Sequence, residues 1–139
     1  MADLDAATST MAASFAFTKI IVRDVEGAVA FYGRIFGLEL VRTVELPDLV
    51  EKLLAAPGQE GGPFLVLYHE YNGPPLNQGN AWGPIGYQVT DVDATYAAAL
   101  GHGGKADVEP FNFEDVRVAM FFDPEGHKVE IIGAPGSAK

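Results

Sequence analysis

Short apolar runs of strand character alternate along this chain with stretches of helical period. Residues 15–23, 38–46 and 64–71 are rich in Val, Leu, Ile, Phe and Tyr, which predicts strands. After the first of these, apolar side chains recur at helical spacing from Val25 to Phe36, which predicts a helix. The first half of the chain therefore predicts a mixed α and β unit.

The predicted helix has signals at both of its ends. Asp24 is a capping residue at its start, and Gly37 supplies the C-terminal stop. Residues 49–56 are less specific. Their side chains favour a helix, but Pro47 and Pro57 flank them, so helix and strand both stay open there.

The second half of the chain repeats the first. Residues 22–30 and 89–97 share the pattern V-x-D-V-acidic-small-x-x-A, and helix-ending Gly37 has a counterpart in Gly104. Three more strands are predicted after the second helix, at residues 105–113, 115–122 and 128–132. A duplicated unit of one strand, one helix and three strands is the fold that this pattern predicts.

The last two predicted strands form a hairpin around Asp-Pro-Glu-Gly at residues 123–126, where Pro and Gly suit the corners of a turn. Beyond the turn, Glu130 lies between Val129 and Ile131 in a strand that should be largely buried. A buried carboxylate needs a partner, a proton or a metal. The structural alternative is that Glu130 reaches solvent or a neighbouring arginine.

Composition limits the classes of partner. The chain has 139 residues, of which 48% are hydrophobic, enough for one compact domain. Its net charge is −10 and it has no basic run, which argues against nucleic acid as a partner. It contains no cysteine for disulfides or thiolate chemistry. No apolar run is long enough to span a bilayer, so no membrane partner and a cytoplasmic location are predicted.

The same reading gives a domain organisation. Residues 1–14, rich in Ala, Ser and Thr, are predicted to be a disordered leader, and residues 134–139 a flexible tail. The domain between them spans 15–133, with one module at about 15–72 and the other at about 82–133.

The duplicated βαβββ unit, the V-x-D-V pattern before a helix carrying Phe31-Tyr32, and the closing D-P-x-G-x-x-x-E at residues 123–130 together resemble the vicinal oxygen chelate superfamily. This is the group of glyoxalases, bleomycin-resistance proteins and extradiol dioxygenases. The resemblance implies an α+β fold in which two curled half-sheets enclose a cavity. It also implies a homodimer whose partner completes the cavity, and Tyr71 and Trp82 flank a Gly/Pro loop suited to that contact.

Enzymes of this superfamily hold a divalent metal in the cavity, and a substrate with adjacent oxygens chelates it. The positions that the resemblance assigns to the four ligands are Phe17, about Val66, Pro84 and Glu130. Three of these are apolar, so the sequence predicts no metal and no cofactor. A divalent metal is the alternative, with Glu130 as the only retained ligand position.

The resemblance also implies which side chains line the cavity. The candidate ligand-binding residues are Phe17, Lys19, Val66, Tyr68, Gln88, Met120 and Glu130. This lining suits an organic ligand, and it suits a filled core equally well. Glu130 is the candidate catalytic residue, either as a general base with a raised pKa or as a structural partner of Lys19. By strand alternation, His69 and His127 point away from the cavity, whereas His102 lies at a helix end.

Two functions from different classes remain. One is a metal-independent protein that binds a small organic compound, partly aromatic or cationic, as drug-resistance members of the superfamily do. The other is a lyase, isomerase or dioxygenase-like enzyme, using either a metal or Glu130 alone.

Overall fold

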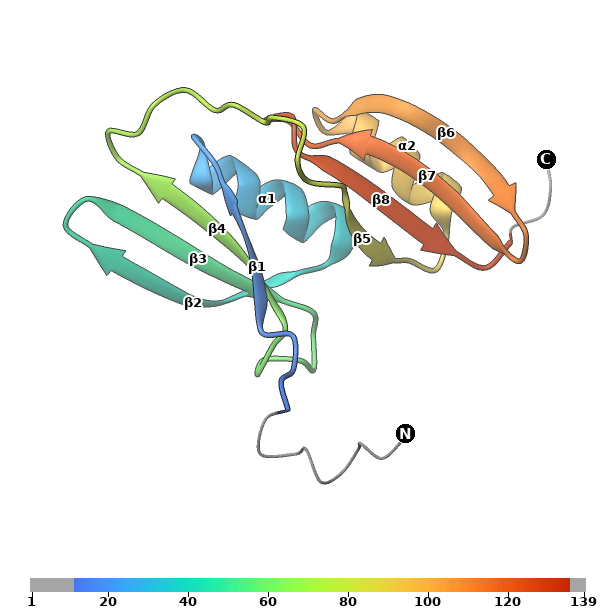
Figure 1. The fold of residues 1–139 in the computed structure, drawn as a ribbon. Helices are drawn as coiled ribbons and strands as arrows, with labels where there is room; N and C mark the ends of the chain where they lie inside the picture. The colour runs from blue at the N-terminus through green and yellow to red at the C-terminus, as the bar shows by residue number, and fades with distance from the viewer. Residues whose placement is uncertain (1–11, 136–139) are drawn as a thin grey trace.

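Two four-stranded sheets, each with its own helix, make up the computed structural model, which describes residues 12–135 (Figure 1). The first unit consists of β1 (Phe17–Ile21), α1 (Val25–Phe36), β2 (Glu39–Leu46), β3 (Leu49–Ala55) and β4 (Phe64–Glu70). The second consists of β5 (Ile85–Gln88), α2 (Val92–Gly101), β6 (Lys105–Phe113), β7 (Val116–Phe122) and β8 (Lys128–Gly133). We call these units the first and second modules.

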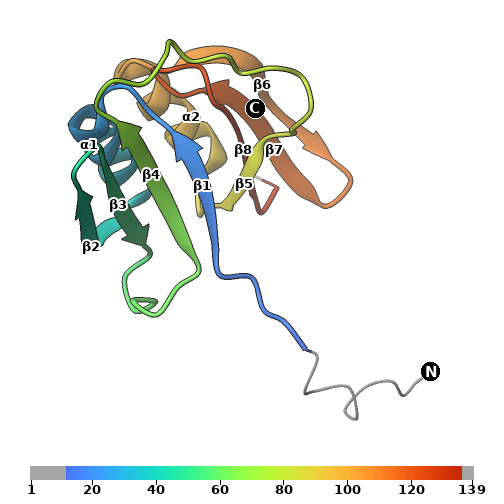
Figure 2. The ribbon, with the colours of Figure 1, turned by 60° about the vertical axis from the view of Figure 1, so that its left-hand side comes forward.

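The two sheets have the same topology. The strand order is β1-β4-β3-β2 in the first and β5-β8-β7-β6 in the second. In each module the first strand runs parallel to the last, and the remaining neighbours are antiparallel. β1 and β5 are therefore edge strands, and the loop that leaves β4 crosses between the modules and leads into β5 (Figure 2).

Side-chain caps explain where the helices begin. The carboxylate of Asp24 accepts a hydrogen bond from the Gly27 amide at 2.9 Å, and that of Asp91 accepts one from Ala94 at 3.0 Å. Gly37 ends α1 in the left-handed region, at φ 69°, where its N–H donates to Gly33. The caps and the glycine stop that the sequence predicted for α1 are thus confirmed.

The core lies between the helices and one face of each sheet. Phe31 and Tyr32 of α1 and Tyr96 of α2 pack in one cluster with strand residues such as Leu67 and Ile131, which are fully buried. Because strand side chains alternate, the residues between these core positions lie on the opposite face of each sheet. That second face carries the residues that the sequence singled out for binding.

The predicted α+β fold of two tandem βαβββ modules is confirmed, and the sheets are curled but not closed into a barrel. Residues 49–56, left open between helix and strand, contain strand β3. β3 pairs with β2 on one side and β4 on the other, and this central position outweighs the helix propensity of its side chains.

Neither helix within residues 12–135 is long and apolar enough to cross a membrane. Most of the leader and of the tail expected from the sequence falls on residues 1–11 and 136–139, which lie outside the described residues.

Candidate functional site

Four of the predicted ligand-binding residues gather on one face of the first sheet. The register pairs Phe17 with Phe64, Lys19 with Val66, and Ile21 with Tyr68. Phe17 is 51% exposed, whereas Val66 in the central strand is only 3% exposed. This face therefore presents a mixed aromatic, aliphatic and charged surface opposite the helix.

Lys19 has a different partner from the one considered above. Its Nζ lies 2.6 Å from Oε2 of Glu51 in β3, so the ion pair that Lys19 forms in this structure is with Glu51 and not with Glu130, the alternative considered from the sequence. The ammonium also lies 5.5 Å from the ring centroid of Phe17 and 5.3 Å from that of Tyr68, within range of a cation–π interaction. Lys19 is thus held by its own sheet.

The other three predicted residues lie on the second sheet. Glu130 pairs with Gly86 on one side and with Met120 on the other, and Gln88 follows two residues after Gly86. Glu130 is half-buried between the fully buried Val129 and Ile131. A side chain placed at Gly86 would meet no atom within 4 Å, so the space beside Glu130 is open.

These two groups of candidate residues lie on separate sheets, and no strand of one sheet pairs with a strand of the other among the described residues. The side chains at the four ligand positions of the resemblance do not fit a metal ion, because Phe17, Val66 and Pro84 offer no donor atom. Across residues 12–135, no group of three His, Asp or Glu side chains is placed to hold a metal.

A groove of about 780 Å³ runs along the open edge of β1. Phe17 and Lys19 line it from the first module, Ile85 and His127 line it from the second, and residues 74–78 and Trp82 line it from the connecting loop. Trp82 is 92% exposed, so it does not pack against its own chain. The groove is mostly apolar and combines aromatic side chains with a few charged ones, as organic-ligand sites do.

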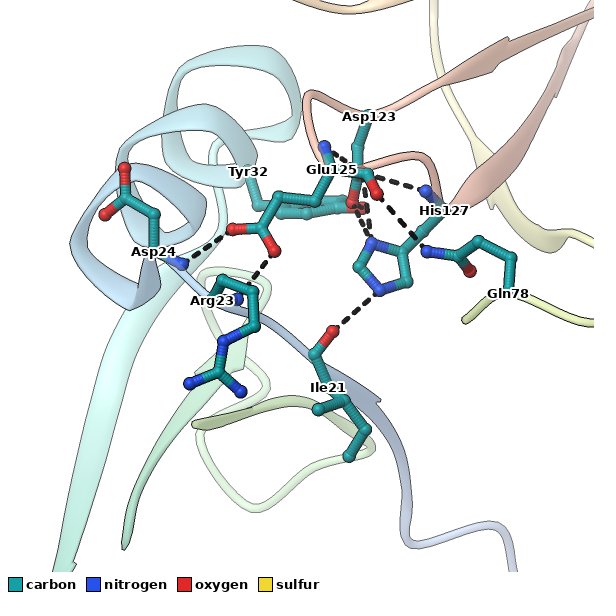
Figure 3. Close-up of polar contacts among 8 residues, drawn as sticks. All are labelled: Ile21, Arg23, Asp24, Tyr32, Gln78, Asp123, Glu125 and His127. Atoms are coloured by element: carbon teal, nitrogen blue, oxygen red, sulfur yellow. Dashed lines mark hydrogen bonds and ion pairs between the residues drawn. The ribbon is translucent and has the colours of Figure 1, made fainter. Parts of the chain in front are cut away.

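A buried carboxylate in the turn between β7 and β8 organises a polar network that includes His127 of the groove lining (Figure 3). Asp123 is 3% exposed and accepts a hydrogen bond from the Tyr32 hydroxyl at 2.7 Å. It also accepts from the amides of Glu125 and His127, at 2.9 and 3.0 Å. Nδ1 of His127 lies 2.9 Å from Oδ2 of Asp123.

The same turn reaches across to the first module. Nε2 of His127 lies 2.8 Å from the carbonyl oxygen of Ile21, at the end of β1. The Glu125 carboxylate accepts from the amides of Arg23 and Asp24, at 2.6 and 2.7 Å. From the connecting loop, Gln78 donates to the Glu125 carbonyl at 3.2 Å. Figure 3 shows these contacts converging from β1, α1 and the loop onto one turn.

Burial and charge act against each other in this network. Burial disfavours the charged form of Asp123, but the hydrogen bond and charge of His127 outweigh it and lower the pKa of the carboxyl. Burial likewise disfavours the imidazolium, yet the hydrogen bond and charge of Asp123 raise the pKa of His127. Tyr32 is buried beside Asp123, so its pKa is raised and it stays a neutral donor.

An Asp–His pair beside a groove resembles a general base, but the geometry argues against that role. A general base needs a free ring nitrogen within reach of the substrate. Both nitrogens of His127 already lie within hydrogen-bond distance of protein oxygens, one from Asp123 and one from Ile21. The pair therefore holds structure rather than offering a site for proton abstraction.

Sequence reasoning missed this network. His127 was expected to point away from the cavity, but it precedes β8, so strand alternation does not apply, and its ring lines the groove. The local signal was the D-P-x-G-H turn itself, which has one aspartate and one histidine four residues apart. His102 was correctly placed at a helix end, where its Nδ1 lies 2.8 Å from the Ala98 carbonyl oxygen.

The sequence is similar to a known family over most of its length. A family model for the glyoxalase, bleomycin resistance protein and dioxygenase superfamily matches residues 14–131. The lactoylglutathione lyase of Haemophilus influenzae is 31% identical over 120 residues, covering 83% of this chain and 88% of that protein. The lactoylglutathione lyase of Salmonella typhimurium is 27% identical over 126 residues, covering 88% and 93%.

Solved structures have the same fold. A glyoxalase I variant from Zea mays superposes with a TM-score of 0.77 at 24% identity, and the match covers 85% of this chain and 46% of the maize chain. The trypanothione-dependent glyoxalase I of Leishmania major gives a TM-score of 0.77 at 23% identity, covering 88% of this chain and 87% of its own.

Proposed function

Because the chain belongs to the glyoxalase, bleomycin resistance protein and dioxygenase superfamily, we propose that it binds a small organic ligand between its two modules without a metal. The ligand is partly aromatic or cationic. The observation that carries the proposal is the apolar character of Phe17, Val66 and Pro84 at three of the four positions where the superfamily places metal ligands. A lone carboxylate at Glu130 does not supply the donors that a tightly held metal requires.

The groove supports the ligand side of the proposal. Its volume of about 780 Å³ lies within the range of sites for drug-sized compounds, and its lining comes from both modules. Phe17 and Trp82 offer aromatic surface, and Lys19 and Glu70 offer charge. On the neighbouring sheet face, Glu130 lies beside the open space at Gly86, where it can accept a hydrogen bond from an amine or a hydroxyl.

A ligand screen tests the proposal directly. Trp82 is the single tryptophan of the chain and lines the groove, so quenching of its fluorescence reports a compound that enters. For a compound found in this way, we expect Glu130→Gln to weaken the binding affinity by roughly tenfold to a hundredfold, which is the effect of losing one charge-assisted hydrogen bond. Asp115→Asn, a charge change in the exposed turn before β7, is the matched control and should leave affinity unchanged. If the compound binds Glu130→Gln and the wild type with equal affinity, Glu130 does not take part in binding.

Metal content is the second measurement. We expect elemental analysis of the purified protein to find zinc, nickel, manganese and iron far below one atom per chain. A metal near one per chain that is lost in Glu130→Ala would contradict the proposal, because only a true ligand would control the occupancy.

A lactoylglutathione lyase activity is the competing function, and the names of the relatives at 31% and 27% identity favour it. In that case Glu130 would act as a base, alone or with a metal. Formation of lactoylglutathione by the wild-type protein, abolished by a chelator or by Glu130→Gln, would select this function over simple binding.

We also infer that the protein works as a homodimer in the cytoplasm. The single chain leaves Tyr71 and Trp82 exposed, at 43% and 92%; Tyr71 directly follows β4, and Trp82 lines the groove. Exposed aromatic anchors of this kind commonly carry the affinity of protein interfaces. Sedimentation at micromolar concentration should give a dimer, and Trp82→Ser should shift it toward monomer. A monomer in the wild type would argue against a shared site.

A further inference from the structure

The turn between β7 and β8 is where the polar contacts of the two modules meet. Its Asp123 binds Tyr32 of α1, its Glu125 binds the backbone at the β1–α1 junction, and its His127 binds the end of β1. Two of these three side chains are charged acceptors, and only the imidazole supplies N–H donors. The protonation state of His127 therefore decides how many of these contacts form.

The hydrogen-bond partners of His127 fix its proton count. The carbonyl oxygen of Ile21 can only accept, so Nε2 must carry a proton to bind it at 2.8 Å. Asp123 receives two backbone N–H groups and the Tyr32 hydroxyl, so it is an ionised acceptor as well. Nδ1 must then carry a proton too, and the arrangement requires the imidazolium.

The charges around the ring favour this state. Asp123 and Glu125 from the same turn act on the ring directly. The other titratable and charged groups nearby are Tyr32 of α1 and Tyr87 of β5, which interact with Asp123; Arg23 and Asp24, whose backbone amides donate to Glu125; and Lys19 and Glu70, which line the same groove as His127. The two carboxylates of the turn both favour the charged form of the ring. The pKa of His127 is raised in the folded protein, in keeping with the geometry.

We infer that His127 is a proton-controlled latch: as the imidazolium it joins the second module to the end of β1, and on losing a proton it releases that contact and loosens the groove between the modules. A neutral imidazole has a single N–H, so it can donate to Asp123 or to Ile21 but not to both. The oxygen that receives no N–H then faces the lone pair of the other ring nitrogen, and this contact is repulsive in a half-buried site.

The direction of the pH dependence follows from the sign of each shift. A raised pKa of His127 gives stabilisation that is complete below the ordinary histidine pKa and is lost as pH rises through the raised value. The lowered pKa of Asp123 gives stabilisation that is present above the ordinary aspartate pKa and is lost as pH falls through the lowered value. The latch is therefore closed in mildly acid solution and opens on the alkaline side.

The amide groups of Arg23 and Asp24 report the latch without any ligand. Both donate to Glu125, so their hydrogen exchange and amide chemical shifts measure whether the turn is docked. We expect their protection, corrected for intrinsic exchange, to fall roughly tenfold or more between about pH 5 and about pH 9. The carbon-bound ring protons of His127 should titrate with the same midpoint, above the ordinary value of about 6.5.

Two variants separate the latch from a general pH effect. In His127→Gln the side-chain amide cannot titrate, so the pH-dependent change at Arg23 and Asp24 should vanish. His102→Gln alters a histidine at the end of α2 and should retain the full change. A transition that persists in His127→Gln would overturn the inference. A His127 ring that titrates at or below the ordinary value in the wild type would do the same, even if the variant failed to fold.

Discussion

The two modules differ most in the turns that join their last two strands. In the first module, residues 56–63 between β3 and β4 form a glycine- and proline-rich loop whose hydrogen bonds stay within the module. In the second, residues 123–127 between β7 and β8 carry three side chains that form hydrogen bonds with the first module. Equivalent places in a duplicated fold have therefore taken different roles.

Burial explains how the difference arises. Gln59 and Glu60 in the first loop are exposed, and Glu60 accepts a hydrogen bond from the nearby Gly58 amide. Asp123 is almost fully buried and satisfies four donors at once. A buried carboxylate fixes its surroundings because any lost partner leaves a desolvated charge. Duplication repeats the scaffold, whereas the contact between modules needs charged side chains in only one of the two turns.

Removing the buried charge is the strongest test of whether the two turns differ in their contribution to stability. We expect Asp123→Asn to lower the free energy of unfolding by about 3–5 kcal/mol, because His127 would lose its counter-charge in a buried site. Glu60→Gln in the equivalent loop should change it by no more than about 0.5 kcal/mol. Urea unfolding at mildly acid pH measures both, and equal effects would mean that the two turns do not differ in role.

The next test concerns two buried tyrosines. The Tyr32 hydroxyl donates to Asp123, whereas the buried Tyr87 hydroxyl has no hydrogen-bond partner among the described residues. Tyr32→Phe should therefore cost about 1.5–3 kcal/mol, the usual loss for a hydrogen bond to a charged group. Tyr87→Phe should be neutral or stabilising, since it removes an unsatisfied polar atom. Thermal unfolding of the two variants side by side gives the answer, and the reverse order of effects would refute this account of the network.

The fold followed from local patterns, and the network did not. Helix caps such as Asp24 and Asp91 act within three residues, so the sequence alone located them. The partner of Lys19 depends on β3, the segment that the sequence left open between helix and strand. The direction of His127 depends on how a turn docks on the other module, and no pattern along the chain encodes that.

Candidate site residues divide in the same way. The resemblance, extended by strand alternation, put Phe17, Lys19, Val66 and Tyr68 on one face, and the register between β1 and β4 agrees. It also put Gln88, Met120 and Glu130 on one face of the second sheet, which the register of β5, β7 and β8 bears out. Whether the two faces act together depends on packing between modules or chains, which alternation does not describe. Their roles in binding stay predictions.

The smallest expected effect compares two ion pairs of similar length. Lys19 lies 2.6 Å from Glu51, and His127 lies 2.9 Å from Asp123, but the first pair is on the surface. The Lys19 side chain is 37% exposed and that of Glu51 18%, against 13% and 4% in the second pair. Water and salt screen exposed pairs, so Lys19→Met should lower the free energy of unfolding by at most about 1 kcal/mol.

This loss should shrink further in about 1 M salt, where charges are screened within roughly 3 Å. The effect of Asp123→Asn should persist in the same buffer, because its charge is buried. Urea unfolding of both variants at low and high salt checks this, and a salt-resistant loss of several kcal/mol for Lys19→Met would show that the first sheet, too, depends on a strong buried pair.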